Sequence, residues 1–356
     1  MKPVIIIAEA GVNHNGSITM AKKLVDAAEE AGADFVKFQT FKAEKLASSV
    51  AQKATYQKTD DDSLSQLQML KALELSDEMH HQLRDYCASK KVSFLSTAFE
   101  QESLEYLDKR LNLTLHKIPS GEITNGPLLV EFGRTKKPLV LSTGMASLEE
   151  VELALMAIGW GMTQPQPPNN IDDIRENWSL PSVKDQVKRQ VTLLHCTSQY
   201  PAPMEDVNLK AMTTLGQVYG TRVGYSDHTQ GIEVAIAATA LGAKVIEKHF
   251  TLDRTLEGPD HKASLEPDEL TAMVSSIRHI ESALGDGIKQ PRESETNTIA
   301  VARKSLVAAT PISAGEVFCV ENVTVKRPST GRSPMEYWST LGSIAQRDYQ
   351  PDEVIQ

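Results

Sequence analysis

Cysteine is scarce in this chain, and its three cysteines lie far apart. Cys87, Cys196 and Cys319 have none of the close spacings that are typical of a metal cluster or a disulfide framework. Isolated thiols of this kind are usual in the reducing cytosol. We therefore expect a cytoplasmic chain.

Long apolar runs are also missing. The apolar run at residues 4–8 follows Lys2 and stops at Glu9, so it is shorter than the roughly 7–15 apolar residues of a signal-peptide core. No stretch approaches the roughly 18 apolar residues that a membrane-spanning helix needs. The sequence predicts neither a signal peptide nor a membrane segment.

Positive charge is in deficit, because 37 basic residues face 47 acidic ones and the net charge is -10. No basic stripe is present, which argues against a nucleic-acid partner. An anionic small molecule is still compatible with this balance, since a few lysines focused in a cleft outweigh a diffuse acidic surface.

Strand-length apolar runs alternate with helical patterns through residues 1–284. We expect eight strands, at residues 4–8, 35–38, 93–96, 115–118, 139–141, 191–195, 222–224 and 245–250. Eight such units in about 284 residues fit an α/β fold with a closed (β/α)₈ barrel. An open doubly wound sheet is the alternative, but no glycine-rich phosphate-binding fingerprint follows the first strand.

Two regions interrupt this rhythm. Residues 159–190 include a proline- and asparagine-rich stretch, and we interpret them as a loop insertion. Residues 285–300 are polar and are interpreted as a linker. Short strands at 305–308, 317–318 and 323–325, with a turn at 311–315, then predict a small domain at residues 301–356. So small a domain is close to the lower limit for independent stability, so we expect it to dock on the barrel or on a partner chain.

Polar side chains mark the predicted carboxyl ends of the strands, where the active sites of such barrels lie. A charged side chain that ends an apolar strand is costly unless it is used. The set comprises Glu9, Lys37, Gln39, Thr97, Lys117, Ser120, Glu122, Ser142, Thr143, His195, Ser226, Asp227, His228, Glu247 and His249.

His228 and His249 end neighbouring strands, so their imidazoles can meet one cation. Two ligands do not close a structural site, and water or substrate would have to complete the shell, as in catalytic sites. Nitrogen and oxygen ligation leaves Mn²⁺, Mg²⁺, Fe²⁺ and Zn²⁺ open.

Lys37 and Lys117 come from different strands and should converge on the barrel mouth. They could form ion pairs with Glu9 or Glu247, or they could grip a ligand that carries phosphate and carboxylate groups. Lys117 could also form a Schiff base, as in aldolases.

Several motifs in order give the chain a resemblance to the bacterial sialic acid synthase family, along nearly its whole length. They are AEAGVNHNG at residues 8–16, VKFQT at 36–40, KIPSGE at 117–122, LSTGM at 141–145, HCT at 195–197, YSDH at 225–228, EKHFT at 247–251 and GPDH at 258–261. The tail, with ARKS at 302–305 and VKRP at 325–328, resembles the antifreeze-like (SAF) domain of that family.

The resemblance implies a reaction in which phosphoenolpyruvate condenses with an N-acylated amino sugar. It implies that His228 and His249 bind Mn²⁺ or Mg²⁺, which polarises the sugar aldehyde. Glu122 matches the carboxylate that activates water, although a carboxylate at this place could instead cap a helix. Positions that grip phosphoenolpyruvate match Lys37, Lys117, Thr97, Ser120 and Ser226, and positions that hold the sugar match Glu9, Tyr200 and Asp260. Gln39 shares the inward face with Lys37 and is expected in the same pocket.

Arg327 matches an arginine that the family inserts into the partner subunit's site, so the resemblance implies a domain-swapped homodimer. On its own, the Lys326-Arg327-Pro328 segment is equally compatible with a solvated turn. His14 is a weaker candidate for the mouth of the site. Ala98 and Ser198 depart from the usual pattern of the family, which has proline at the first position and asparagine or threonine at the second.

The sugar remains open between N-acetylmannosamine and a diacetamido-trideoxy sugar that leads to legionaminic acid. The motifs at 123–125, 200–203 and 261–264 favour the second sugar. Two other functions are compatible with the residues: a Schiff-base pyruvate aldolase that uses Lys117, and a non-catalytic sugar-binding protein of surface-polysaccharide assembly.

Overall fold

The computed structural model describes residues 3–48, 51 and 65–356, which form two compact units, residues 1–285 and 286–356. Each unit is described by itself. No helix among the described residues is long and apolar enough to cross a membrane.

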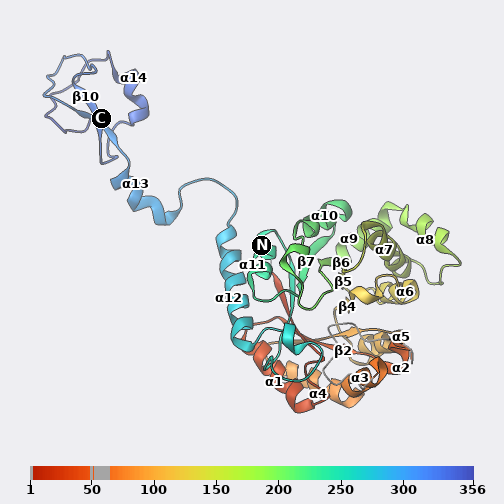
Figure 1. The fold of residues 1–356 in the computed structure, drawn as a ribbon. Helices are drawn as coiled ribbons and strands as arrows, with labels where there is room; N and C mark the ends of the chain where they lie inside the picture. The colour runs from red at the N-terminus through yellow and green to blue at the C-terminus, as the bar shows by residue number, and fades with distance from the viewer. Residues whose placement is uncertain (1–2, 49–50, 52–64) are drawn as a thin grey trace. The chain divides into compact units, whose positions relative to one another are not determined.

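The first unit is a closed barrel of eight parallel strands in chain order (Figure 1). The predicted barrel is confirmed, and most strands extend further toward their carboxyl ends than the apolar runs indicated. They are β1 (Ile5–Gly11), β2 (Phe35–Thr40), β3 (Ser93–Ala98), β4 (His116–Ile118), β5 (Leu139–Ser142), β6 (Val191–His195), β7 (Arg222–Asp227) and β8 (Val245–His249). β8 closes the ring against β1 and sets Glu9 beside His249.

Helices surround the barrel and bury an apolar stripe against it. In α1 (Ile18–Glu30), Ser17 caps the first turn and Ala21, Leu24 and Val25 are buried at helical spacing. The other helices that cover the strands or their connections are α2 (Ala43–Leu46), α3 (Gln66–Leu73), α4 (Asp77–Ala88), α5 (Gln101–Glu105), α6 (Gly126–Arg134), α7 (Leu148–Thr163), α10 (Lys210–Tyr219), α11 (Glu233–Ala240) and α12 (Pro267–Leu284).

The interpretation of residues 159–190 as a loop is wrong. α7 continues to Thr163, and α8 (Ile171–Trp178) and α9 (Pro181–Gln190) fill most of the remainder and pack on α7. Both added helices are amphipathic, with Ile174 and Trp178 buried on α8 and Val183 and Val187 buried on α9. The prolines that suggested a loop occupy the connection before α8 and the first turn of α9, where proline is tolerated.

The second unit has its own small apolar core. β9 (Ser305–Ala308) pairs antiparallel with β10 (Val323–Lys326), and short helical segments lie at α13 (Thr296–Ala302) and α14 (Tyr337–Thr340). The predicted strand at 317–318 is only a bridge between Val317 and Ile344. Half of the predicted linker is helical, because a 3₁₀ turn (Glu293–Glu295) leads into α13. The core residues are Leu306, Ala308, Ile312, Phe318, Val323, Ala345, Tyr349 and Ile355.

Candidate active site

A cavity of about 500 Å³ opens at the carboxyl ends of the barrel strands. Twelve side chains predicted for the site line it, namely Glu9, Lys37, Gln39, Thr97, Lys117, Ser120, Glu122, Tyr200, Ser226, His228, His249 and Asp260. They come from the ends of seven strands or from the loops that follow them. The eighth strand, β5, adds Ser142 to the lining. The strand register brings them together, since inward positions at the same edge of a parallel barrel face one another.

Two lysines and two glutamates form a buried charge cluster at the floor of this cavity. Lys37 Nζ lies 2.7 Å from Glu9 and 3.4 Å from Glu247, and Lys117 Nζ lies 3.3 Å from Glu247. Thr97 Oγ1 accepts a hydrogen bond from Lys37 at 3.0 Å. The predicted ion-pair arrangement is therefore present, with Glu247 as the carboxylate shared by both lysines.

Burial and neighbouring charges give the members of this cluster different protonation behaviour. Burial alone would raise the pKa of Glu247, but Lys117 and Lys37 outweigh it and hold that pKa well below its usual range. At Glu9 burial prevails over Lys37 and raises the pKa to about 7. Burial lowers the pKa of Lys117 against the opposing effect of Glu247, whereas at Lys37 the two carboxylates outweigh burial and the pKa is raised. A bound anion would therefore contact Lys37, whose positive charge is stabilised, and Lys117, whose positive charge is less stabilised.

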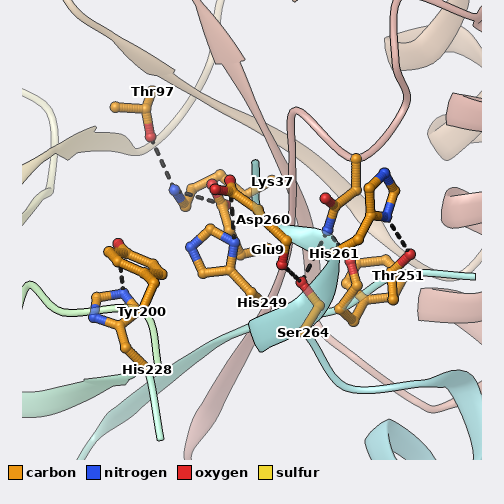
Figure 2. A network of polar contacts seen from close by, with 12 residues as sticks. Glu9, Lys37, Thr97, Tyr200, His228, His249, Thr251, Asp260, His261 and Ser264 are labelled. Carbon is orange, nitrogen blue, oxygen red and sulfur yellow. Dashed lines mark hydrogen bonds and ion pairs between the residues drawn. The ribbon is translucent and has the colours of Figure 1, made fainter. Parts of the chain in front are cut away.

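His228 and His249 lie side by side, with ring centroids 5.6 Å apart. His228 Nδ1 donates to the carbonyl of Thr197 at 2.7 Å, so its Nε2 is the lone-pair nitrogen and accepts from the hydroxyl of Tyr200 at 2.9 Å. Figure 2 shows the contact between Tyr200 and His228, with the Tyr200 ring against the His228 ring. Burial lowers the pKa of His228 to about 4, and burial together with His228 holds the pKa of His249 well below its usual range. Both imidazoles are neutral at physiological pH.

These two histidines fit a divalent cation. A metal ligand must be a neutral imidazole with a lone pair to offer. Nδ1 of His249 is buried without a hydrogen-bond partner among the described residues, and Nε2 of His228 carries a lone pair that accepts from the Tyr200 hydroxyl, which a cation would displace. Across the described residues, no group of three or more histidine, cysteine, aspartate or glutamate side chains forms a metal-type cluster. Two histidine ligands would leave the shell open to water or substrate, and the metal site stays a prediction.

Asp260 borders the histidines, with its Oδ2 3.7 Å from Nδ1 of His249. Burial raises the pKa of this carboxyl to about 6, although Lys37 opposes the effect. Its loop is tied to the turn after β1, because Asn13 donates to Ser264 Oγ and Ser264 donates to the carbonyl of Asp260 (Figure 2). This explains the asparagine of the sequence motif, for which no role was predicted.

Ser120 and Glu122 form a 3₁₀ turn directly after β4. Ser120 Oγ accepts the backbone N–H of Gly144 at 2.9 Å. A Cβ on Gly144 would approach Ser198 Oγ to 2.2 Å, so only glycine permits this close passage of the β5 loop. Glu122 accepts from Asn125, which itself caps α6, so Glu122 is not the capping group and its carboxylate lines the cavity.

Four predicted residues of the first unit, His14, Thr143, His195 and Asp227, are not among those that line the cavity. Arg327 belongs to the second unit, where it is exposed and its Nε donates to the carbonyl of Ala302. His14 is fully buried, and its Nδ1 accepts the backbone N–H of Gly16, so its suggested place at the mouth is wrong.

The structure adds features that the sequence reasoning did not assign. Lys248 and Asp227 form an ion pair, 2.9 Å apart and with no exposed side-chain surface, between β8 and β7. Each precedes one of the two histidines and points to the opposite side of its strand. A second addition is an apolar lining from α3, whose sequence was not assigned to any element.

Comparison with known proteins identifies the family of the chain. Residues 24–289 match the model of the NeuB family, and residues 303–356 match that of the SAF domain. The chain belongs to the NeuB family. The predicted resemblance to sialic acid synthases is thereby confirmed.

Relatives within the NeuB family match the chain along its whole length. The N,N'-diacetyllegionaminic acid synthase of Campylobacter jejuni is 49% identical over 100% of this chain and 99% of its own. The enzyme of the same name from Legionella pneumophila is 45% identical over 95% of this chain and 89% of its own. The crystal structure of N-acetylneuraminic acid synthetase from Leptospira borgpetersenii, in complex with citrate, has a TM-score of 0.67 at 33% identity and covers 84% of this chain and 90% of that one.

Proposed function

We propose that this NeuB-family chain condenses phosphoenolpyruvate with an N-acylated mannosamine-type sugar and water, giving a nine-carbon nonulosonic acid and phosphate. One observation carries the proposal: a single cavity joins two buried lysines, a glutamate at its wall and two neutral histidines. The synthases among its relatives support the same reaction class.

The lysine side of the cavity suits phosphoenolpyruvate, which carries a phosphate and a carboxylate. Lys37 and Lys117 supply two positive charges, and Thr97, Ser120 and Ser226 supply hydroxyls beside them. Binding the anion would draw the lysines partly away from Glu9 and Glu247. The cluster thus keeps both lysines in place while the site is empty of substrate.

The histidine side suits the sugar. A Mn²⁺ or Mg²⁺ ion on His228 and His249 would act as a Lewis acid toward the sugar aldehyde. Tyr200 and Asp260 flank the histidines and can hydrogen-bond the sugar hydroxyls or its amide. Glu9, with its pKa near 7, can hold a proton close to the same place.

The bond changes balance with one water. C3 of phosphoenolpyruvate bonds to the aldehyde carbon, and water adds at C2 while the Glu122 carboxylate accepts one of its protons. The C2–O bond to phosphate breaks as the C2 hydroxyl becomes a carbonyl. The two protons of the water end on the former aldehyde oxygen and on the released phosphate. We further propose a cytoplasmic homodimer in which Arg327 enters the site of the partner.

One experiment tests the reaction directly. Protein loaded with Mn²⁺ is incubated with phosphoenolpyruvate and either N-acetylmannosamine or 2,4-diacetamido-2,4,6-trideoxymannose, and phosphate and product mass are measured. We expect one phosphate per nonulosonic acid, no phosphate without sugar, and loss of turnover with a chelator. With phosphoenolpyruvate labelled with ¹⁸O at the bridging oxygen, the label should leave in phosphate.

A Schiff-base aldolase is the second candidate, because burial lowers the pKa of the Lys117 amine and so favours the nucleophilic form. It would add pyruvate itself to the sugar. Borohydride trapping of a pyruvate adduct on Lys117, with activity that survives the chelator, would establish it and refute the synthase. Absence of turnover with every sugar would instead favour a non-catalytic sugar-binding protein.

A further inference from the structure

One side of the cavity carries no charge at all. Six side chains form what we call the apolar wall: Val12, Leu46, Met69, Leu70, Leu73 and Phe99. They belong to a small hydrophobic cluster that is separate from the barrel core. The wall faces the same space as the lysines and the histidines, so the cavity has a charged half and an apolar half.

Half of the wall, Met69, Leu70 and Leu73, comes from α3. Ser65 caps this helix, and Ser65 and Gln68 form a reciprocal capping box. Leu73 is buried at the far end, whereas Met69 and Leu70, one turn earlier, are only partly buried and line the cavity. Gln66 lines the cavity beside them and offers an amide.

Phosphoenolpyruvate is not expected to contact this wall, because its phosphate and carboxylate groups would bind to the lysines. The wall must therefore face the sugar. A sugar hydroxyl set against it would lose water without gaining a hydrogen bond, whereas a methyl group would gain contact. An acetamido group would use both the apolar surface, for its methyl, and the neighbouring Gln66 amide.

We propose that the apolar wall is a subsite for methyl groups of the sugar, and that Met69 and Leu70 thereby select a deoxygenated, doubly acylated amino sugar. The proposal rests on the synthase function above and deepens it. Compared with N-acetylmannosamine, 2,4-diacetamido-2,4,6-trideoxymannose carries a methyl in place of the C6 hydroxymethyl group and an acetamido group in place of the C4 hydroxyl. Each change exchanges a group that the wall disfavours for one that it accepts.

The expected size of the preference follows from the chemistry of apolar pockets. A methyl-sized contact in such a pocket is worth about 10- to 200-fold in specificity. We expect kcat/KM for the trideoxy sugar to exceed that for N-acetylmannosamine by about 100-fold.

The test is the ratio of kcat/KM for the two sugars, measured in the wild type, Met69→Asn and Leu70→Asn. Each variant should lower this ratio about 10-fold or more, because kcat/KM for the trideoxy sugar falls. The KM for phosphoenolpyruvate should stay within about 2-fold of the wild-type value. Lys71→Ala is the matched control, because Lys71 is an exposed residue on the same helix that does not line the cavity. Met69 and Leu70 are chosen over Leu73 because they are partly exposed, and thermal unfolding checks that the variants fold.

The outcomes separate the two proposals. Equal use of both sugars by the wild type, or an unchanged ratio in folded variants, would overturn the subsite and leave the synthase intact. If the wild type releases no phosphate with either sugar, the synthase fails. Calorimetric binding of the two sugars to the wild type and the same variants then decides the subsite without turnover, and equal affinities would overturn it.

Discussion

The two histidines show how burial prepares a residue for its role. An imidazole in water is partly protonated near neutral pH, but His228 and His249 are buried and their pKa values are lowered, so neither needs to lose a proton before it binds a cation. We predict that His228→Ala or His249→Ala reduces turnover by at least about 1000-fold and abolishes Mn²⁺ binding, while the protein stays folded. Phosphate release and metal content of the purified variants measure this.

His279→Ala is the matched control, because His279 is exposed on α12 and does not line the cavity. It should keep full metal content and turnover. Metal dependence that persists unchanged in both site variants would refute the assignment.

Most of the site could be predicted residue by residue, for a geometric reason. Side chains alternate along a strand, and the carboxyl ends of parallel strands meet at one edge, so Lys37, Lys117 and His249 were expected to converge. Glu9 and Glu247 were predicted as possible partners of the lysines, but which carboxylate pairs with which lysine was not. The 2.7 Å contact of Lys37 with Glu9 and the bridging place of Glu247 depend on side-chain positions across the barrel. Arg327 lies in the other unit, where strand geometry gives no prediction.

At the scale of elements, an ion pair between Lys248 and Asp227 joins β8 to β7. Lys248 and Asp227 are fully buried, and each is the chain neighbour of a histidine. Removing one partner of such a pair leaves an uncompensated buried charge, which costs about 3–5 kcal/mol. We predict this loss of unfolding free energy for Lys248→Met, measured by urea denaturation, together with weaker Mn²⁺ binding.

The double variant Asp227→Asn with Lys248→Met provides the control, since it removes both charges at once. It should be more stable than Lys248→Met alone. If the double variant is the less stable of the two, the cost lies in packing or in the hydrogen bonds from Thr229 to Asp227 rather than in the unpaired charge.

Elements were predictable where the pattern of apolar residues was regular. All eight strands follow apolar runs, and they were predicted close to their observed positions. α8 and α9 were missed because five of the six residues at 165–170 are prolines or asparagines, which favour turns. Each of these two short helices also has only two buried apolar residues, so its helical pattern is weak. α3 was missed because its apolar face packs on a small cluster over the cavity rather than on the barrel.

At the scale of the whole molecule, the placing of Arg327 in a partner's site can be decided by mixing subunits. Arg327 is exposed within its own unit, where its guanidinium donates to the carbonyl of Ala302. We predict that His249→Ala and Arg327→Ala homodimers are each nearly inactive. Refolding them together should restore activity, because in a mixed dimer the Arg327→Ala chain keeps its histidines and receives Arg327 from the other chain. An arginine that acts within its own chain gives no restoration.

The acid stability of the barrel follows from its buried histidines. Burial, with a smaller effect of His80, lowers the pKa of His14 from 6.5 to about 4, and burial also lowers the pKa values of His80, His116, His195 and His261. Protonation of His14 would place a proton on Nδ1, which already accepts from Gly16. Below pH 6.5 the unfolded chain therefore binds a proton that the folded barrel does not, so stability falls as pH drops from 6.5 toward 4.

His14→Asn isolates one of these groups, because its amide oxygen can keep the acceptor role at Gly16 and does not titrate. Between pH 7 and pH 5 we expect the wild type to lose about 2 kcal/mol more unfolding free energy than this variant. The measurement is urea denaturation followed by the fluorescence of Trp160 and Trp178, with Trp338→Phe in both proteins so that only the barrel reports. The exposed His279→Asn should leave the pH dependence unchanged. Parallel pH curves for wild type and His14→Asn would show that His14 is protonated in the folded barrel as readily as in the unfolded chain.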